Sequence, residues 1–291
     1  MDSHEHHFLP IFYLEGFTND ENKFYIYLKD QNRFKKNKKL FSPASHFWIR
    51  DDNTMNFEGK QSDHIEELYS ITDSQIAVLF KKFQSNPSAI PPLTDNEFVF
   101  LEYFIGKLYW RLPFQIPKLK ALAENRKLKT LGIIFRDKTN NEVVEDAELE
   151  EKIKKSGNLP LMLKSMYPGL FYPLLFDRIS KMRIFNFPTN LPNLIGDNPI
   201  IMKKENSFTF YKDDFIFPLT PNKILVRSDN IVERVVANVK VEIDMYILMQ
   251  SSYTACTDLN YPRMLREVFL NEYQTLEFLR DCIFKKLLPN N

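Results

Sequence analysis

Polar and apolar side chains alternate along residues 23–29 on a background of aromatic residues, which predicts a strand. Residues 41–50 return to aromatic character and predict a second short strand, so the two form a small N-terminal β unit. The apolar positions of residues 63–83 recur mostly at helical spacing and predict an amphipathic helix. Its apolar positions are Ile65, Leu68, Ile71, Ile76, Leu79, Phe80 and Phe83.

A second helix is predicted over residues 94–112. Thr94 followed by Glu97 has the spacing of a capping box, and Pro113 ends the helix. The helix is strongly apolar and is expected to be mostly buried. Charged side chains interrupt it, which argues against a membrane element: Glu97, Glu102, Lys107 and Arg111.

The middle of the chain continues with helical patterns. Residues 118–131 form a basic helical stretch, and the charged residues 136–157 are either a mobile excursion or an outer helix. Helical periodicity resumes over residues 159–187, with a break near residues 167–169.

From about residue 186 the pattern changes to short β-prone runs separated by Pro, Asn and Asp. Strands or strand ends are predicted at residues 195–202, 208–212, 215–219 and 223–227. Helical patterns return over residues 241–253 and 262–288.

This order predicts an α+β fold in one domain, with a mostly helical centre and small β-rich units from the N-terminal and C-terminal parts. The expected parts are a β-rich unit over 1–60, a helical part over 61–185, a second β-rich unit over 186–235 and C-terminal helices over 236–291.

Composition narrows the choice of function. The 291 residues contain Lys+Arg 39 and Asp+Glu 38, a net charge of +1, which argues against a surface coated for nucleic-acid binding but leaves room for a local basic groove. Glycines number only 7, and the phosphate-binding loops GxGxxG and GxxxxGK[ST] are absent. Cys256 and Cys282 have no Cys or His neighbours in sequence, so a thiolate zinc site is not expected. With no signal peptide or apolar span, a cytoplasmic location is expected and no membrane partner.

Histidines and one Asp-Asn-Pro step are the first candidates for chemistry. His4, His6 and His7 lie close together, but a polar leader with one structural His7 is favoured over a metal cluster. Asp197 and Asn198 lie where a predicted strand turns. Asp197 is suited to ligate a hard cation, position a water or accept a proton; the alternative is an Asx-type turn bonded to the local backbone.

Arg111 lies near the end of an apolar helix, where a buried guanidinium needs a partner. A carboxylate, a substrate phosphate or the C-terminal end of its own helix would each serve. The acidic residues Asp63, Glu66, Glu67 and Asp73 are interpreted as a solvated helix face, with Glu66 and Asp73 seven positions apart.

Four short motifs resemble a bacterial family, domain of unknown function 4238. The pattern H-x-x-P-x-x-Y-L-x-x-F is followed by R-x-P, D-N-P and P-L-[ST]-P in the same order as in that family. The matching residues are His7, Pro10, Tyr13, Leu14, Phe17, Arg111, Pro113, Asp197, Asn198, Pro199, Pro218, Leu219, Thr220 and Pro221. In the family a Ser or Thr often precedes D-N-P, whereas this chain has Gly196. The resemblance implies no established activity, but it strengthens the expectation that His7, Arg111, Asp197 and Asn198 share a pocket.

The first hypothesis is a hydrolase acting on phosphodiesters such as nucleic acid or a nucleotide, in a bacterial defence or toxin-like role by analogy alone. His7 would act as general base or metal ligand, and Asp197 with Asn198 would hold a divalent cation or orient water. Arg111 would bind the substrate and stabilise the growing phosphoryl charge.

The second hypothesis is a non-enzymatic binding protein. The same polar residues would then fix the N-terminal segment in place, and a protein or nucleic-acid partner would dock on aromatic and basic surfaces such as residues 33–40. An open pocket lined by His7, Arg111 and Asp197 favours the enzyme; side chains sealed in mutual hydrogen bonds favour the binding protein.

Overall fold

The two long helices expected from the sequence are present in the structure, a computed structural model. Helix α2 spans His64–Gln84 and α3 spans Asp95–Arg111. The capping box is also present, because Glu97 N donates to Thr94 Oγ1 at 3.3 Å and Thr94 N donates to Glu97 Oε2 at 2.9 Å. The structure describes residues 5–57, 59–144, 146–170, 181–188, 190–204 and 210–288.

Short strands surround these helices in the first part of the chain. The strands are β1 (Glu5–His7), β2 (Phe24–Leu28), β3 (Arg33–Phe34), β4 (Leu40–Phe41), β5 (Trp48–Arg50), β6 (Met55–Phe57), β7 (Lys60–Ser62), β8 (Phe135–Arg136) and β9 (Val143–Val144). The other helices are α1 (Ile11–Glu15), α4 (Ile116–Asn125), α5 (Ala147–Lys155) and α6 (Leu159–Leu170).

The second part of the chain supplies longer strands and the last helices. The strands are β10 (Met182–Asn186), β11 (Leu194–Gly196), β12 (Ile201–Met202), β13 (Phe215–Thr220), β14 (Lys223–Arg227) and β15 (Tyr253–Cys256). The helices are α7 (Asn238–Gln250), α8 (Tyr261–Val268) and α9 (Leu276–Leu287). The fold is therefore α+β, as the sequence predicts.

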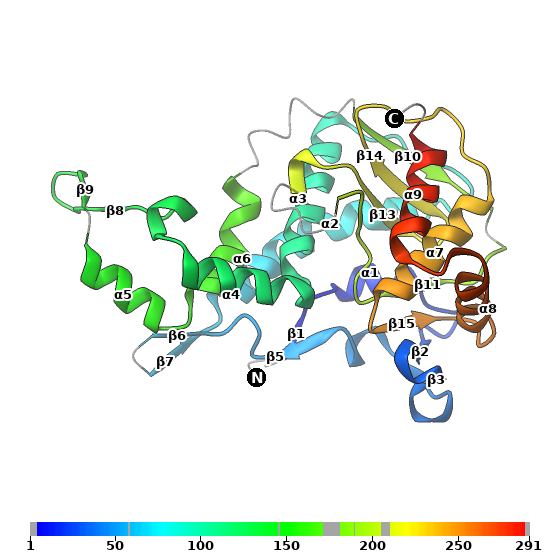
Figure 1. Cartoon of the computed structure of the whole chain (residues 1–291), viewed down its shortest axis with the longest axis horizontal. Coiled ribbons are helices and arrows are strands. Elements are labelled where there is room, and N and C mark those ends of the chain that lie inside the picture. Colours follow the sequence, from blue (N-terminus) through cyan, green and yellow to red (C-terminus); the bar gives the residue numbers. More distant parts are fainter. Residues whose placement is uncertain are drawn as a thin grey trace.

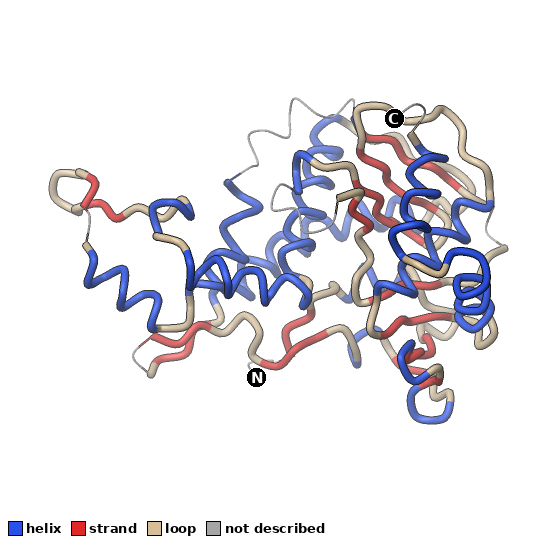
Figure 2. The backbone as a smooth tube through the Cα atoms, in the orientation of Figure 1, coloured by secondary structure: helices blue, strands red, loops and turns tan. Residues whose placement is uncertain are grey.

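Two main sheets lie in one half of the molecule, and α4, α5 and the hairpin β8–β9 extend from the other half (Figure 1). One sheet has the order β10-β14-β13-β12, and the other has the order β11-β15-β2-β3 with β4 paired to β2. Figure 2 shows the helices flanking these strands. The second sheet combines strands from both ends of the chain, so the N-terminal β unit is completed by β15 and β11.

The sheets are buried on both faces between two apolar cores. On β13, Phe217 packs with α2 and α3, whereas the adjacent Ile216 packs with α7, α8 and α9. The same alternation holds on β14 for Leu225 and Val226. A strand buried on both faces reads as a continuous apolar run, which explains why FIFPL and KILVR stand out in the sequence.

Several expected elements are wrong in detail. Helical periodicity was predicted through residue 187, but Met182–Asn186 is strand β10, because its five residues pair with β14 in register. The expected strand at 208–212 is a 3-10 turn over Phe210–Lys212, and residues 208 and 209 lie outside the described residues. The predicted strand at 41–50 is divided into β4 and β5 by a turn at Pro43.

The remaining segments answer open points from the sequence. The charged stretch 136–157 contains the turn and second strand of hairpin β8–β9, followed by an outer helix, α5. The helix expected over 241–253 ends at Gln250, and Tyr253–Cys256 forms β15 instead. Cys256 and Cys282 are both free thiols. Among the described helices, none combines the length and the apolarity needed to cross a bilayer.

Candidate functional site

Arg111, at the end of α3, is held by groups from two other elements. Its Nη1 donates to both carboxylate oxygens of Asp73 on α2, at 3.0 and 2.8 Å. Its Nη2 donates to the backbone carbonyl oxygen of His7 on β1. The guanidinium carbon lies 4.5 Å from the centroid of the Tyr69 ring. Of the partners considered from the sequence, Arg111 has a carboxylate, that of Asp73. The same guanidinium also fixes the N-terminal strand β1 through the His7 carbonyl.

His7 meets Arg111 through its backbone, and its imidazole turns elsewhere. The Nε2 atom lies 3.2 Å from the carbonyl oxygen of Ala44, in the turn before β5. The side chain is half-buried, and this burial lowers the pKa of His7 below its usual value. A neutral imidazole that donates to Ala44 ties β1 to the segment that follows β4.

A second ion pair lies beside the first. Lys164 on α6 is buried, and its Nζ donates to the Asp52 carboxylate and to Asn53 Oδ1, the latter at 2.9 Å. Asn53 Nδ2 donates to Glu66 Oε2 at 2.6 Å, and Asn53 N donates to His6 Nδ1 at 2.9 Å. Burial lowers the pKa of Lys164, although Asp52 opposes that change.

Lys107 is the third buried cation of this region. Its Nζ donates to Thr72 Oγ1 and lies 5.0 Å from the centroid of the Tyr69 ring. Burial, reinforced by the charge of Arg111, lowers the pKa of Lys107 to about 8. We call these side chains the polar network: Asp52, Asn53, Glu66, Tyr69, Asp73, Lys107, Arg111 and Lys164.

The Asp-Asn-Pro bend is held by a different part of the chain. Asp197 Oδ1 accepts from Ser252 N at 3.0 Å, and Asn198 N donates to Ser251 Oγ at 3.3 Å. Gln250 Nε2 donates to the Asn198 carbonyl oxygen at 2.7 Å. Burial raises the pKa of Asp197 to about 6. The bend is thus clamped onto the last residue of α7 and the residues that follow it.

The four residues singled out from the sequence fall into two groups. His7 and Arg111 are hydrogen-bonded to each other, whereas the partners of Asp197 and Asn198 lie between Gln250 and Tyr253. Within the part of the chain that the structure describes, no hydrogen bond or ion pair joins the two groups. In both, the polar groups are used to fix segments to one another.

The acidic helix face was interpreted as solvated, and this is wrong for three of its four residues. Asp73 pairs with Arg111, Glu66 accepts from Asn53, and Asp63 Oδ1 accepts from Thr54 Oγ1 at 2.5 Å. The available signal was the spacing of Glu66 and Asp73 on one face, together with a buried Arg111 that required a carboxylate. Lys164 and Asp52 gave no such signal because 112 positions separate them.

Metal ligation gains no support from these groups. Among the described residues, no three His, Cys, Asp or Glu side chains are grouped so that they could hold a metal ion. His4, which was weighed as part of a histidine cluster, lies outside the described residues.

A basic surface is formed by the loop between β3 and β4 and by α8. The loop projects from the lower right of the molecule in Figure 1. Arg263 on α8 lies with its guanidinium carbon 5.6 Å from the centroid of the buried Phe34 ring. Burial raises the pKa of Tyr27, the neighbour of Phe34, and the nearby positive charges of Arg266 and Arg263 oppose this change. We define the basic surface as Arg33, Lys35, Lys36, Lys38, Lys39, Arg263 and Arg266.

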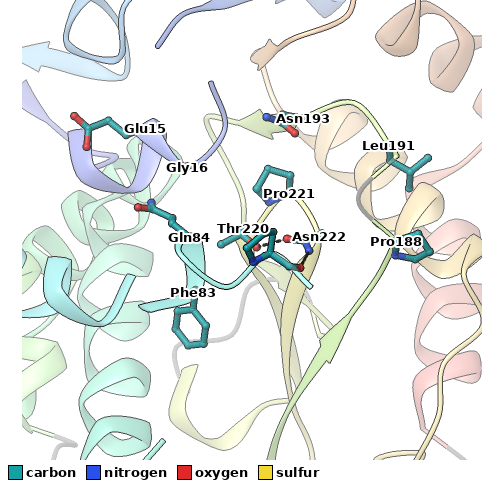
Figure 3. A pocket seen from close by; sticks show the side chains of 11 residues that line it. Glu15, Gly16, Phe83, Gln84, Pro188, Leu191, Asn193, Thr220, Pro221 and Asn222 are labelled. Carbon is teal, nitrogen blue, oxygen red and sulfur yellow. Dashed lines mark hydrogen bonds between the residues drawn. The ribbon is translucent and has the colours of Figure 1, made fainter. Parts of the chain in front are cut away.

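One cavity of about 320 Å³ lies where the ends of α1 and α2 meet the β13–β14 turn and the segment before β11. Figure 3 shows its lining side chains, with Thr220 and Asn222 joined by a hydrogen bond in the middle. Gly16 lies within the motif H-x-x-P-x-x-Y-L-x-x-F, and Thr220 belongs to the motif P-L-[ST]-P. Neither His7, Arg111 nor Asp197 lines it.

Comparisons with known proteins bear on the family alone. No curated protein and no solved structure matches the chain. A family model described as "Protein of unknown function (DUF4238)" matches residues 5–273. That range includes all four motifs, from His7 to Pro221. The chain therefore belongs to the DUF4238 family.

Proposed function

We propose that this protein binds nucleic acid, using the basic surface to contact phosphate groups. The observation that carries the proposal is the concentration of positive charge on one projecting loop. Five of the seven residues 33–39 are Lys or Arg, and no Asp or Glu occurs between Asp30 and Asp51. The loop lysines are largely exposed, and Arg263 and Arg266 extend the charge from a second element.

The loop has a backbone conformation that is unusual for residues other than glycine. Lys36, Asn37 and Lys38 all have positive φ, a region that costs a non-glycine residue about 1 kcal/mol or more. Underneath, Phe34 and Phe41 are buried and anchor both ends of the loop. Because these aromatic rings are not available for stacking on bases, contacts would be to phosphates and would carry little sequence preference.

Binding that neutralises phosphates depends steeply on salt. If five cations each replace a counterion on duplex DNA, log K falls against log salt with a slope of about −4 to −5. The test is fluorescence anisotropy with short duplex and single-stranded oligonucleotides at several salt concentrations. Lys36→Glu/Lys39→Glu should abolish binding. Lys120→Glu/Lys127→Glu makes the same charge change in and just after α4, outside the basic surface, and should leave binding unchanged.

Two results would count against this function. Equal loss of affinity in both double variants would mean that the overall charge matters and the basic surface does not. Binding to an acidic protein but to neither oligonucleotide would assign the surface to a protein partner instead.

A phosphodiester hydrolase remains the second candidate, and the position of His7 favours it. The half-buried imidazole contacts Ala44, in the segment that leads directly from the basic loop, and Lys107 with its lowered pKa lies in the adjoining polar network. This candidate requires that a phosphodiester reach the neutral imidazole, the form that acts as a general base.

Hydrolysis of an oligonucleotide and of a simple phosphodiester, with and without divalent cations, tests this candidate. His7→Gln should remove the activity, whereas His64→Gln, which changes an exposed histidine on α2, should not. Asp197→Asn separates the two groups of candidate residues: unchanged turnover would assign Asp197 a purely structural role. No turnover in the wild type under any condition would remove this candidate.

A further inference from the structure

Helix α2 presents a row of apolar side chains to solvent. Leu68, Ile71 and Val78 are 41%, 58% and 63% exposed. Positions three and seven apart return to the same face of a helix, so these three side chains lie along one stripe. The opposite face of α2 packs in the core and consists of Ile65, Tyr69, Ile76, Leu79, Phe80 and Phe83. We call Leu68, Ile71 and Val78 the α2 stripe.

The core does not account for the α2 stripe. Leu68 and Ile71 are among the apolar positions that predicted the helix, yet both face away from the apolar core. Single exposed apolar side chains are common, but several on one face of one element mark an interaction site. Helix α2 lies beside α3 in the middle of the molecule (Figure 1). Its 21 residues span about 30 Å, which is long enough to pack along another helix.

Charge is ordered along one edge of the stripe. Glu67, Ser74 and Lys81 follow one another at intervals of seven residues, so they share this edge, and all three are exposed. Lys81 forms no ion pair in the described part of the chain. Glu67 contacts only an exposed imidazole there, His64 Nδ1 at 3.3 Å. The edge is therefore acidic at one end, basic at the other and polar in the middle.

This order is complementary to itself in an antiparallel pair. A twofold axis that passes between positions 74 and 75, perpendicular to the helix, places Ile71 against the partner's Val78 and Val78 against the partner's Ile71. The same rotation brings equivalent edges together, so Glu67 faces the partner's Lys81 at each end. Ser74 lies near the axis, and the helix dipoles oppose one another favourably.

The other edge of the stripe fits the same arrangement. Leu68 faces the partner's Lys82, whose ammonium group is bonded to Glu97 of its own chain and whose alkyl stem is available for packing. Gln75 lies near the axis on this side. A parallel arrangement would instead place Glu67 against the partner's Glu67 and Lys81 against the partner's Lys81. The order of charges therefore selects the antiparallel pair.

We propose that two copies of this chain associate through antiparallel pairing of their α2 helices, with Ile71 and Val78 in the centre and Glu67–Lys81 ion pairs at both ends. One helix pair is a small interface, so the dimer is weak, with a Kd of roughly 10–1000 µM. The inference does not depend on nucleic-acid binding, because the α2 stripe and the basic surface share no residue.

Sedimentation velocity on the full-length chain, over concentrations that span this range, tests the proposal. The average mass of the wild type should rise from that of the monomer towards that of the dimer. Val78→Asp should remain monomeric, because it places a charge in the centre of the interface. Val236→Asp is the matched control: this valine is 61% exposed and precedes α7, so association should be unchanged.

Exchanging the two charges tests the antiparallel register. Glu67→Lys and Lys81→Glu each place like charges at both ends of the pair and should weaken association about fivefold or more. An equimolar mixture of the two variants should recover the association of the wild type, because each introduced charge then faces an opposite one. Glu21→Lys mixed with Lys81→Glu is the control and should give no recovery.

Three results would overturn the proposal. The first is a wild type that stays monomeric over the whole range. The second is undiminished association of Val78→Asp, which would assign the contact to another surface. The third is a mixture of Glu67→Lys and Lys81→Glu that associates no better than either variant alone, which would exclude the antiparallel pairing. Unchanged melting temperatures of the variants, whose altered side chains are all exposed, confirm that each is folded.

Discussion

The hydroxyl group of Tyr13 donates a 2.7 Å hydrogen bond to the backbone carbonyl oxygen of Pro218, 205 positions further along the chain. Both residues belong to family motifs, the first to H-x-x-P-x-x-Y-L-x-x-F and the second to P-L-[ST]-P. The Tyr13 ring also stacks on Phe217, with centroids 5.3 Å apart. The first and last motifs therefore meet in the core, and Arg111 joins the second motif to His7 in the same way.

Removing the Tyr13 hydroxyl should destabilise the protein without altering its shape. In Tyr13→Phe the Pro218 carbonyl oxygen stays buried and loses its donor, which costs about 1–2 kcal/mol. Urea unfolding measures this difference. Tyr25→Phe is the matched control, because this half-buried ring packs edge-on against Phe34 and its hydroxyl has no hydrogen-bond partner in the described part of the chain. Equal stability of wild type and Tyr13→Phe would show that the motifs are not held together by this bond.

The Arg111–Asp73 pair should be far more sensitive than ion pairs on the surface. Asp73→Asn leaves a guanidinium of 3% exposed area without its counter-charge, and removing one partner of a buried pair costs about 3 kcal/mol or more. Arg111→Lys should also be strongly destabilising, since one ammonium cannot bond Asp73 in bidentate fashion, reach the His7 carbonyl and stack on Tyr69.

Denaturant unfolding and hydrogen exchange would both report this loss. Exchange should rise first at Phe8 N, which donates to the Phe47 carbonyl beside β1, because Arg111 fixes this strand through His7. Glu151→Gln breaks the exposed pair with Lys155 and should change stability by less than about 0.5 kcal/mol. Similar effects in both variants would contradict a clamping role for Arg111.

Local signals explain which elements could be read from the sequence. The Thr94–Glu97 capping box and the apolar spacing of α2 involve residues a few positions apart, and both are present in the structure. Strand β15 was missed because its four residues carry no turn signal and its partner β2 lies at the other end of the chain. Strand β10 was misread as helix because pairing with β14 overrides its local pattern.

The candidate site shows the same division. The need of a buried Arg111 for a carboxylate was predictable from its place at the end of an apolar helix, but the choice of Asp73 depended on how α2 packs against α3. Grouping His7 with Asp197 rested on the order of motifs alone. Order along the chain does not determine distance in space, and the structure assigns the two residues to separate clamps.

Asp197 should make stability depend on pH in mildly acidic solution. Its folded pKa of about 6 lies above the ordinary aspartate value of about 3.9, so the folded state binds the proton more tightly than the unfolded state. The stability that the protein gains from this tighter proton binding at Asp197 is complete below about pH 4 and is lost as the pH rises through about 6. Relative to Asp197→Asn, the wild type should therefore lose about 3 kcal/mol between these limits.

The measurement is urea unfolding of both proteins at a series of pH values. Taking the difference between wild type and Asp197→Asn removes contributions from other groups that titrate in the same range, such as His46, whose pKa burial lowers to about 4. Asp20→Asn, an exposed change, should give a profile parallel to that of the wild type. If the profile of Asp197→Asn were also parallel to that of the wild type, a raised pKa for the buried Asp197 would be ruled out.

Gly196 stands where the family often has Ser or Thr. In this chain a side chain at position 196 should clash with Ser251. A Cβ atom at this position would lie 2.0 Å from Ser251 Oγ and 2.9 Å from Ser251 Cβ. The Ser251 hydroxyl thus occupies the space of a residue-196 side chain and accepts from Asn198 N. Gly196→Ser should destabilise the protein by about 1–3 kcal/mol through overpacking.

The combination of Gly196→Ser with Ser251→Gly should recover much of that loss, because the new hydroxyl enters the vacated space next to Asn198 N. A double-mutant cycle in urea should therefore show favourable coupling of about 1 kcal/mol or more between the two positions. Gly169→Ser is the control: a Cβ there meets no atom within 4 Å, and stability should change little. Additive effects at positions 196 and 251 would mean that Ser251 does not replace the missing hydroxyl, and the bend would need another source of order.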